Sequence, residues 1–184
     1  DAVYVRVHTM GNPEPYIELY SPSGALLGAT YWYDPGTVTM LSSALPSTGI
    51  YTVLVSDDIN NEPGETGSYE IYVQRVNNPS NAIPISFGQP VPGSIDSVAD
   101  VGTHTFDAVE ADVIKVRMTT FGTLDPFFEL YGPDGKSLAS NYLYDTGTVE
   151  ILVGPLTVTG VYTILASDEY FDRPGETGSY EIYV

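Results

Sequence analysis

Acidic side chains gather in two loops that lie at equivalent positions in the chain. The carboxylates in these loops are Asp57, Asp58, Glu62, Glu65, Asp168, Glu169, Asp172 and Glu176. Calcium takes about six to eight oxygen ligands, so four carboxylates in one short loop could supply half a coordination shell. The loops therefore predict Ca²⁺ as a cofactor, most strongly at Asp57 and Asp168, where both loops carry the same residue. No spaced Asp-x-Asp-x-Asp-Gly pattern is present, so a solvated acidic hairpin is the alternative.

Aromatic residues form a second repeated group with a possible binding role. They are Tyr31, Trp32, Tyr33, Tyr142 and Tyr144. Exposed aromatic rings can stack on sugars or form protein contacts, whereas repeated aromatics also serve commonly in cores. The single Trp32 is replaced by Leu143 in the second group, which argues against one ligand platform shared by both. We favour packing or contact between domains over sugar binding.

No grouping of residues in the sequence indicates catalysis. The two histidines, His8 and His104, stand at unrelated positions, and there is no Cys. A nucleophilic triad or a zinc site needs several such residues together. The chain is therefore predicted not to be an enzyme.

The sequence repeats itself with an offset of 111 residues. Residues 63–73 and 174–184 are identical, and the alignment of 1–73 with 112–184 has no gap, with about half of its positions identical. Matches fall mostly on turn Gly and Pro and on alternating apolar or Tyr residues. A fixed-offset repeat of this kind indicates similar structural units in series.

Short alternating apolar runs separated by Gly and Pro turns are typical of β-strands. Strands are expected over 1–8, 16–20, 26–33, 37–41, 49–55 and 67–73, over their counterparts after residue 111, and over 89–95 and 103–107. No helical periodicity of useful length is present. The sequence predicts an all-β protein with two tandem antiparallel β-sandwich (jelly-roll-like) domains.

We place the first unit at 1–73, a linker at 74–84 and the second unit at 85–184. The strands at 89–95 and 103–107 open the second unit, and the first has no counterpart of them. Because an unpaired sheet edge is an aggregation hazard, we expect either a longer array or opening strands supplied by another molecule. Tyr69, Ile71, Tyr180 and Ile182 are expected to fill the two cores.

Charge excludes several partners. Twenty-four acidic residues against six basic residues give a formal net charge of −18. Nucleic acid and anionic membrane surfaces both need clustered Lys and Arg, so neither is an expected partner. No apolar run approaches the roughly 20 residues that span a bilayer, so membrane insertion is not expected.

The motifs, in their order, resemble the bacterial pre-peptidase C-terminal (PPC) domain. They lie at 103–106, 111–116, 128–135, 160–164 and 177–182. The resemblance implies a jelly-roll-like sandwich carried as a non-catalytic accessory module by secreted or surface proteins. Some relatives in bacterial collagenases look like calcium-dependent collagen binders. Their calcium ligands lie in an N-terminal segment without a match here, so neither ligand is carried over.

Together these observations predict an extracellular or cell-surface repeat module. Its expected role is structural or adhesive, in a stalk, sheath or fibre, with neighbouring copies of the same repeat as partners. One unit could complete the sheet of the next by strand exchange. The alternative is an accessory module of a secreted hydrolase that binds a polymer, either a polysaccharide or a collagen-like protein.

Overall fold

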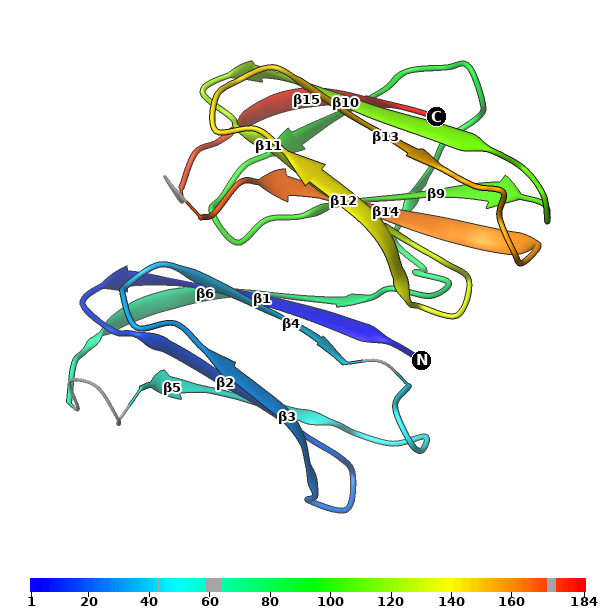
Figure 1. The fold of residues 1–184 in the computed structure, drawn as a ribbon. Helices are drawn as coiled ribbons and strands as arrows, with labels where there is room; N and C mark the ends of the chain where they lie inside the picture. The colour runs from blue at the N-terminus through cyan, green and yellow to red at the C-terminus, as the bar shows by residue number, and fades with distance from the viewer. Residues whose placement is uncertain (43, 59–63, 172–174) are drawn as a thin grey trace. The chain divides into compact units, whose positions relative to one another are not determined.

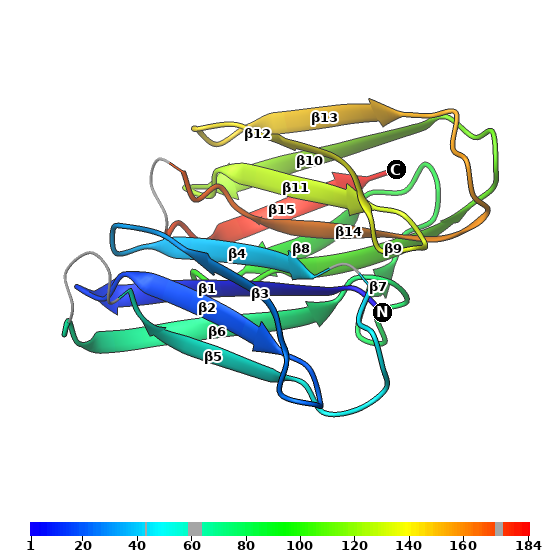
Figure 2. The same cartoon turned by 60° about the horizontal axis from the view of Figure 1, so that its bottom comes forward.

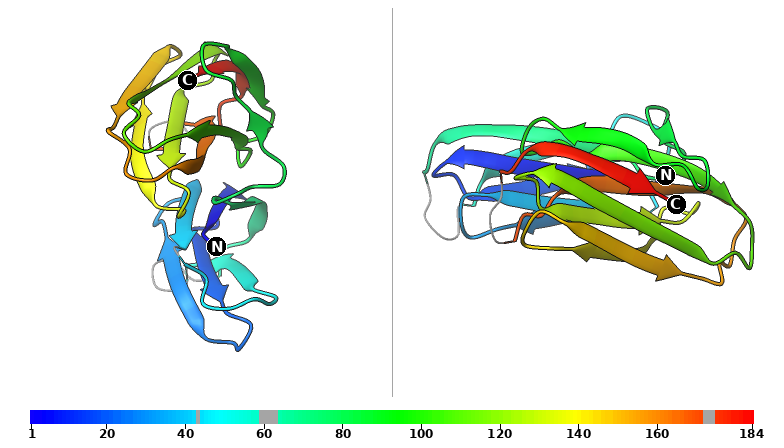
Figure 3. Two further views of the ribbon diagram at one scale, coloured as in Figure 1. Left: turned by 90° about the vertical axis from the view of Figure 1, so that its right-hand side faces the viewer. Right: turned by 90° about the horizontal axis from the view of Figure 1, so that it is seen from above.

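The computed structural model describes residues 1–42, 44–58, 64–171 and 175–184, and every regular element within them is a β-strand. The chain divides into two compact units, Asp1–Gln74 and Arg75–Val184. Each unit consists of two sheets with a core between them (Figure 1, Figure 3). The predicted all-β sandwich architecture is confirmed. No helix in the described part of the chain is long and apolar enough to cross a membrane.

The described residues of unit 1 form six strands. They are β1 (Val3–Gly11), β2 (Pro15–Tyr20), β3 (Leu26–Tyr31), β4 (Thr37–Ser42), β5 (Thr52–Asp57) and β6 (Gly67–Arg75). One sheet has the order β4-β1-β6 and the other β3-β2-β5. The pairings β1–β4, β2–β3 and β2–β5 are antiparallel. The core consists of Val5, Val7, Ile17, Leu19, Val38 and Met40, which come from β1, β2 and β4.

Nine strands lie in the part of unit 2 that the structure describes. They are β7 (Ile83–Pro84), β8 (Val91–Ile95), β9 (Gly102–Ala108), β10 (Ile114–Gly122), β11 (Pro126–Tyr131), β12 (Ser137–Tyr142), β13 (Thr148–Val153), β14 (Gly160–Asp168) and β15 (Gly178–Tyr183). The sheets have the orders β13-β10-β15-β8 and β12-β11-β14-β9-β7. Every pairing in them is antiparallel except that of the short strand β7, which runs parallel to β9.

The strands of the two units follow the sequence repeat. The bounds of β1, β2, β3 and β4, moved by the 111-residue offset, coincide with those of β10, β11, β12 and β13. β5 and β6 correspond to β14 and β15. The two opening strands β8 and β9 pair with β15 and β14 and have no counterpart among the described residues of unit 1. Part of the expected linker, Ile83–Pro84, pairs with β9 and so belongs to a sheet of unit 2.

The prediction that Tyr69 and Ile71 fill a core is wrong, whereas it is confirmed for their counterparts. Tyr180 and Ile182 are 2% and 0% exposed, but Tyr69 and Ile71 are 53% and 43% exposed. The residue types are identical, so the side chains are not the cause. The difference follows from the neighbouring strands. β8 and β9 contribute to the core that buries Tyr180 and Ile182 in unit 2, whereas the described residues of unit 1 contain no such strands.

Candidate functional site

The acidic loop of unit 1 is anchored by Asp57, the last residue of β5. One carboxylate oxygen of Asp57 accepts a hydrogen bond from the backbone N–H of Glu14 at 3.1 Å. The other accepts from the N–H groups of Gly64 at 3.2 Å and Glu65 at 3.1 Å. A carboxylate that accepts several backbone N–H bonds holds a loop strongly, because such bonds are charge-assisted.

Asp168 repeats this arrangement at the end of β14. Its Oδ2 accepts from the backbone N–H of Gly175 at 3.0 Å and of Glu176 at 3.1 Å, and the residue is fully buried. The next residue, Glu169, is also buried and accepts a hydrogen bond from the backbone N–H of Phe171. The need to hold the end of each loop therefore accounts for an aspartate at both positions.

Calcium binding at these loops stays a prediction. Asp58 is buried beside Asp57, and Asp168 and Glu169 likewise lie where the loop leaves β14, whereas Glu65 and Glu176 lie where the loops return to the sheets. Within the described ranges no group of three or more His, Cys, Asp or Glu side chains is arranged to hold a metal ion. Glu62 and Asp172, two of the eight predicted ligands, lie outside the described residues.

In unit 1 the predicted aromatic residues form a small exposed cluster. The ring of Tyr31 lies 6.3 Å from that of Tyr16 and 4.9 Å from that of Tyr33. The Tyr33 hydroxyl donates to that of Tyr31 at 3.0 Å. Tyr31, Trp32 and Tyr33 are 45%, 46% and 55% exposed, so none of them serves as a core residue. β3 ends at Tyr31, two residues before the expected strand end.

In unit 2 the equivalent cluster is larger. Phe127, Tyr142, Tyr144, Tyr170 and Phe171 form a chain of rings with neighbouring centroids 4.4 to 6.4 Å apart. Phe127 is buried, and its ring lies next to those of the exposed Tyr142 and Phe171. The sequence analysis did not include Phe127 or the Tyr170–Phe171 pair. The signal for the pair was a double aromatic in a loop otherwise rich in acidic residues.

The two histidines have structural partners. His104 is fully buried in β9, and its Nε2 lies 2.8 Å from the hydroxyl oxygen of Tyr180 on β15. Burial lowers the pKa of His104 to about 4. In unit 1, Nδ1 of His8 lies 2.9 Å from Oγ1 of Thr37. Burial lowers the pKa of His8 as well, and the positive charge of Arg6 adds to this effect. Both rings are therefore favoured in their neutral form.

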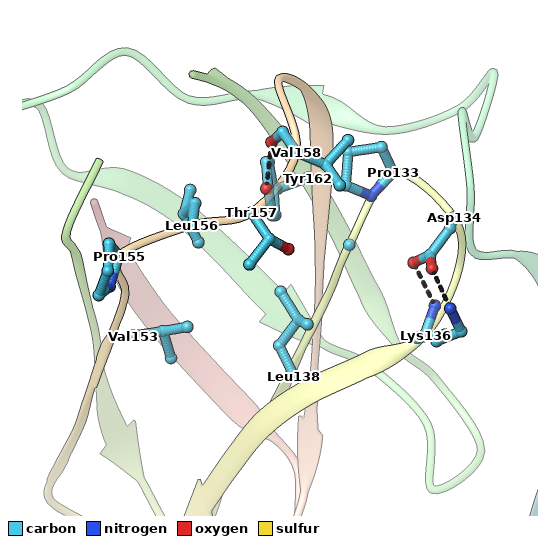
Figure 4. Close-up of a pocket in the computed structure, with 11 residues that line it drawn as sticks. Pro133, Asp134, Lys136, Leu138, Val153, Pro155, Leu156, Thr157, Val158 and Tyr162 are labelled. Carbon is cyan, nitrogen blue, oxygen red and sulfur yellow. Dashed lines mark hydrogen bonds and ion pairs between the residues drawn. The ribbon is translucent and has the colours of Figure 1, made fainter. Parts of the chain in front are cut away.

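A pocket of about 250 Å³ opens at one end of unit 2. Figure 4 shows Leu138, Val153 and Leu156 directed into it, which makes its floor apolar. At the rim, Nζ of Lys136 lies 2.6 Å from Oδ2 of Asp134. This exposed ion pair is the only pair of charged residues in the lining. The pocket is therefore a small recess with an apolar floor and a charged rim.

The most distinctive surface of unit 1 is one that its counterpart in unit 2 keeps covered. We call it the open face and define it by the inward side chains at the free edges of the two sheets, Tyr51, Val53, Val55, Tyr69, Ile71 and Val73. In the described part of unit 1, β5 and β6 are both terminal strands of their sheets, whereas β14 and β15 each have an additional neighbour (Figure 2). Within the described residues, unit 1 therefore has two terminal strands with partly or largely exposed apolar side chains beside them.

Comparisons with known proteins give only distant likenesses. No protein-family model matches the chain, and no curated protein matches it. The pre-peptidase C-terminal domain of a collagenase from Bacillus anthracis is similar in structure, with 16% identity over 58% of this chain and 97% of that domain and a TM-score of 0.44. PliG from Aeromonas hydrophila, a periplasmic inhibitor of g-type lysozyme, has 17% identity over 55% of this chain and 91% of that protein, with a TM-score of 0.37.

The VP2 subviral particle of infectious bursal disease virus has 12% identity over 98% of this chain and 54% of VP2, with a TM-score of 0.25. At these identities and TM-scores, none of the three structures establishes an activity, ligand or partner for this chain.

Proposed function

We propose that this chain is a non-catalytic, extracellular module of β-sandwich units with a structural or adhesive role in a cell-surface stalk, sheath or fibre. The observation that carries the proposal is the repetition of one sandwich plan along the chain, in which the bounds of four strands of unit 1 recur in unit 2 after the 111-residue offset. Similar units in series are typical of extended repeat proteins. Strand addition, in which one polypeptide extends the sheet of another, would join such units into a chain of sandwiches.

The acidity of the chain suits such a role. A net charge of −18 keeps exposed units soluble and opposes unspecific association between their outer surfaces. Association is then favoured where apolar burial and backbone pairing outweigh charge repulsion. The PPC-like motifs are consistent with placement outside the cell.

The test is immunogold electron microscopy on intact cells that produce the protein, with antibodies raised against this chain. The expected result is label along extended structures at the cell surface. Label confined to the cell interior, or recovered only with a released soluble hydrolase, contradicts the proposal.

A second candidate function is polymer binding by the aromatic cluster of unit 2. The exposed ring of Tyr142 lies next to those of Tyr144 and Phe171, and a row of exposed aromatic rings can bind sugars or Pro-rich chains. Retention on insoluble polysaccharides or fibrillar collagen tests it, with Phe171→Ala as the variant and Leu152→Ala as the control, because Leu152 is 73% exposed elsewhere on the unit. Polymer binding predicts retention that Phe171→Ala alone abolishes. No retention of the wild-type chain removes this candidate.

A further inference from the structure

A pair of exposed tyrosines recurs at the same position in both units. The pair is Tyr31 and Tyr33 in unit 1 and Tyr142 and Tyr144 in unit 2. The ring centroids are 4.9 Å apart in the first pair and 5.2 Å apart in the second, and the rings are inclined at 65° and 71°. All four side chains are between 39% and 55% exposed, so a reagent in solution reaches both pairs. Two neighbouring, accessible phenols are therefore a regular feature of the repeat.

The backbone holds each pair in place. In unit 1 the residue between the two tyrosines, Trp32, donates its backbone N–H to the carbonyl oxygen of Pro15 at 3.1 Å. The equivalent residue of unit 2, Leu143, donates to the carbonyl oxygen of Pro126, also at 3.1 Å. The first ring of the unit 1 pair also stacks on Tyr16 of β2, with the centroids 6.3 Å apart and the planes inclined at 22°. The fold itself therefore keeps the two phenols close together.

The hydroxyl groups of the unit 1 pair are in direct contact. The Tyr33 hydroxyl donates a hydrogen bond to the Tyr31 hydroxyl at 3.0 Å. This bond raises the pKa of Tyr33 above its ordinary value, so the contact persists at neutral pH. An ortho carbon is the ring neighbour of the carbon that carries the hydroxyl, so hydroxyls in contact also bring ortho carbons of the two rings near one another. Two phenols joined through their ortho carbons keep this arrangement, with inclined rings and a hydroxyl on each side of the bond.

We propose that Tyr31 and Tyr33 form a site of oxidative cross-linking, at which a haem peroxidase and hydrogen peroxide join the two rings as dityrosine. The oxidant takes one electron from each phenol, and each phenol loses its hydroxyl proton, which leaves two phenoxyl radicals. Their ortho carbons form a carbon–carbon bond, and the hydrogen on each of these carbons then moves to the oxygen of its own ring. Hydrogen peroxide accepts the two electrons and two protons and becomes two water molecules. Tyr142 and Tyr144 form the equivalent site in unit 2.

The cross-link is expected within a pair and not between chains. Two groups that are already held in contact react as if at a very high concentration, so coupling within the pair exceeds coupling between chains in dilute solution. The product ties Tyr31, the last residue of β3, to the segment that leads to β4. This inference goes beyond the proposed structural role and does not depend on it.

Treatment of the full chain in dilute solution with a haem peroxidase and hydrogen peroxide is the direct test. The monomeric product is isolated by size exclusion, and its dityrosine fluorescence is measured. After cleavage at acidic residues, the peptide that contains residues 31–33 should be lighter by the mass of two hydrogen atoms and should not fragment between the two tyrosines. The peptide that contains residues 142–144 should show the same loss of mass.

Variants assign the cross-link to its residues. Tyr33→Phe should lose the cross-link of unit 1 and keep that of unit 2, because a phenyl ring forms no phenoxyl radical. Tyr20→Phe is the matched control and should keep both, since Tyr20 lies in the same peptide but its hydroxyl donates to Glu18 at 2.9 Å. Tyr33 is exposed and Tyr20 is half-buried, so folding of both variants is expected and is checked by circular dichroism.

Three outcomes overturn the proposal. The first is dityrosine that forms only between chains, and the second is a unit 1 cross-link that persists in Tyr33→Phe. The third is a monomer in which tyrosines are oxidised singly and no dityrosine is found. Cell-surface labelling does not involve this reaction, so failure of the cross-link and failure of the structural role are distinguishable.

Discussion

At the scale of single residues, His104 makes the stability of unit 2 depend on pH. The pKa of His104 is about 4 in the folded chain, against an ordinary value of 6.5. Between pH 4 and pH 6.5 the imidazole of His104 therefore binds a proton more readily in the unfolded chain than in the folded chain. The contribution of the neutral ring is fully present above about pH 6.5 and is lost as the pH falls to 4. The shift corresponds to at most about 3 kcal/mol.

We predict that the free energy of unfolding of unit 2 falls from pH 7 to pH 4 more steeply in the wild-type chain than in His104→Gln. Glutamine can still hydrogen-bond the Tyr180 hydroxyl but does not titrate. Urea denaturation at pH 7, 5.5 and 4 measures the difference, with His8 and the carboxylates common to both proteins. Equal slopes would show that His104 is not buried in its neutral form.

Gly102 supplies a second prediction at this scale. We expect Gly102→Ala to destabilise unit 2 by about 1–3 kcal/mol or more, because the added methyl group overlaps the Tyr180 hydroxyl. Gly28→Ala is the control, since a Cβ there meets its nearest neighbour at an ordinary 3.9 Å. The measurement is the melting temperature by calorimetry. The double variant Gly102→Ala/Tyr180→Phe should lose less stability than the two single variants lose in sum, because removal of the hydroxyl relieves the overlap.

At the scale of elements, the acidic loops depend on the aspartate at the end of each preceding strand. We predict that Asp168→Ala lowers the stability of unit 2 by about 1–3 kcal/mol, because two backbone N–H groups lose a buried acceptor. Asp168→Asn should lose less, since it keeps one acceptor oxygen. The melting temperatures of the two variants are compared with that of the wild-type chain in EDTA. An unchanged melting temperature for Asp168→Ala would show that the loop does not need this anchor.

The calcium hypothesis gives the same variant a second expectation. If the loop also binds the ion, millimolar calcium raises the melting temperature of the wild-type chain by mass action and leaves Asp168→Ala unaffected. If Asp168 is an anchor alone, the loss caused by the substitution is the same in calcium and in EDTA. The two roles are therefore separated by one titration.

The elements show where sequence reasoning succeeds and where it stops. Strand positions and the sandwich could be predicted because alternation and turn residues are local. The exposure of Tyr69 could not be predicted, because burial at this position depends on strands far away in the sequence, and the identical Tyr180 is covered by such strands. The role of Asp57 could not be predicted either, because its hydrogen-bond partners Gly64 and Glu65 are not adjacent to it in the sequence.

At the scale of the whole molecule, the two units differ in the extent of their buried cores. The core of unit 1 draws its fully buried residues from β1, β2 and β4, whereas the core of unit 2 extends through β8, β9, β14 and β15. Apolar burial contributes about 25 cal/mol per Å², so the smaller core provides less stabilisation. Unit 1 should therefore unfold at a lower temperature than unit 2.

We predict two transitions in scanning calorimetry of the full chain. Ile17→Val, in the core of unit 1, should lower only the first, and Ile164→Val, in the core of unit 2, only the second, by about 0.5–1.5 kcal/mol each. A single transition that both substitutions lower would instead mean that the units unfold together. Unit 1 would then derive its stability from the rest of the chain, despite its uncovered apolar face.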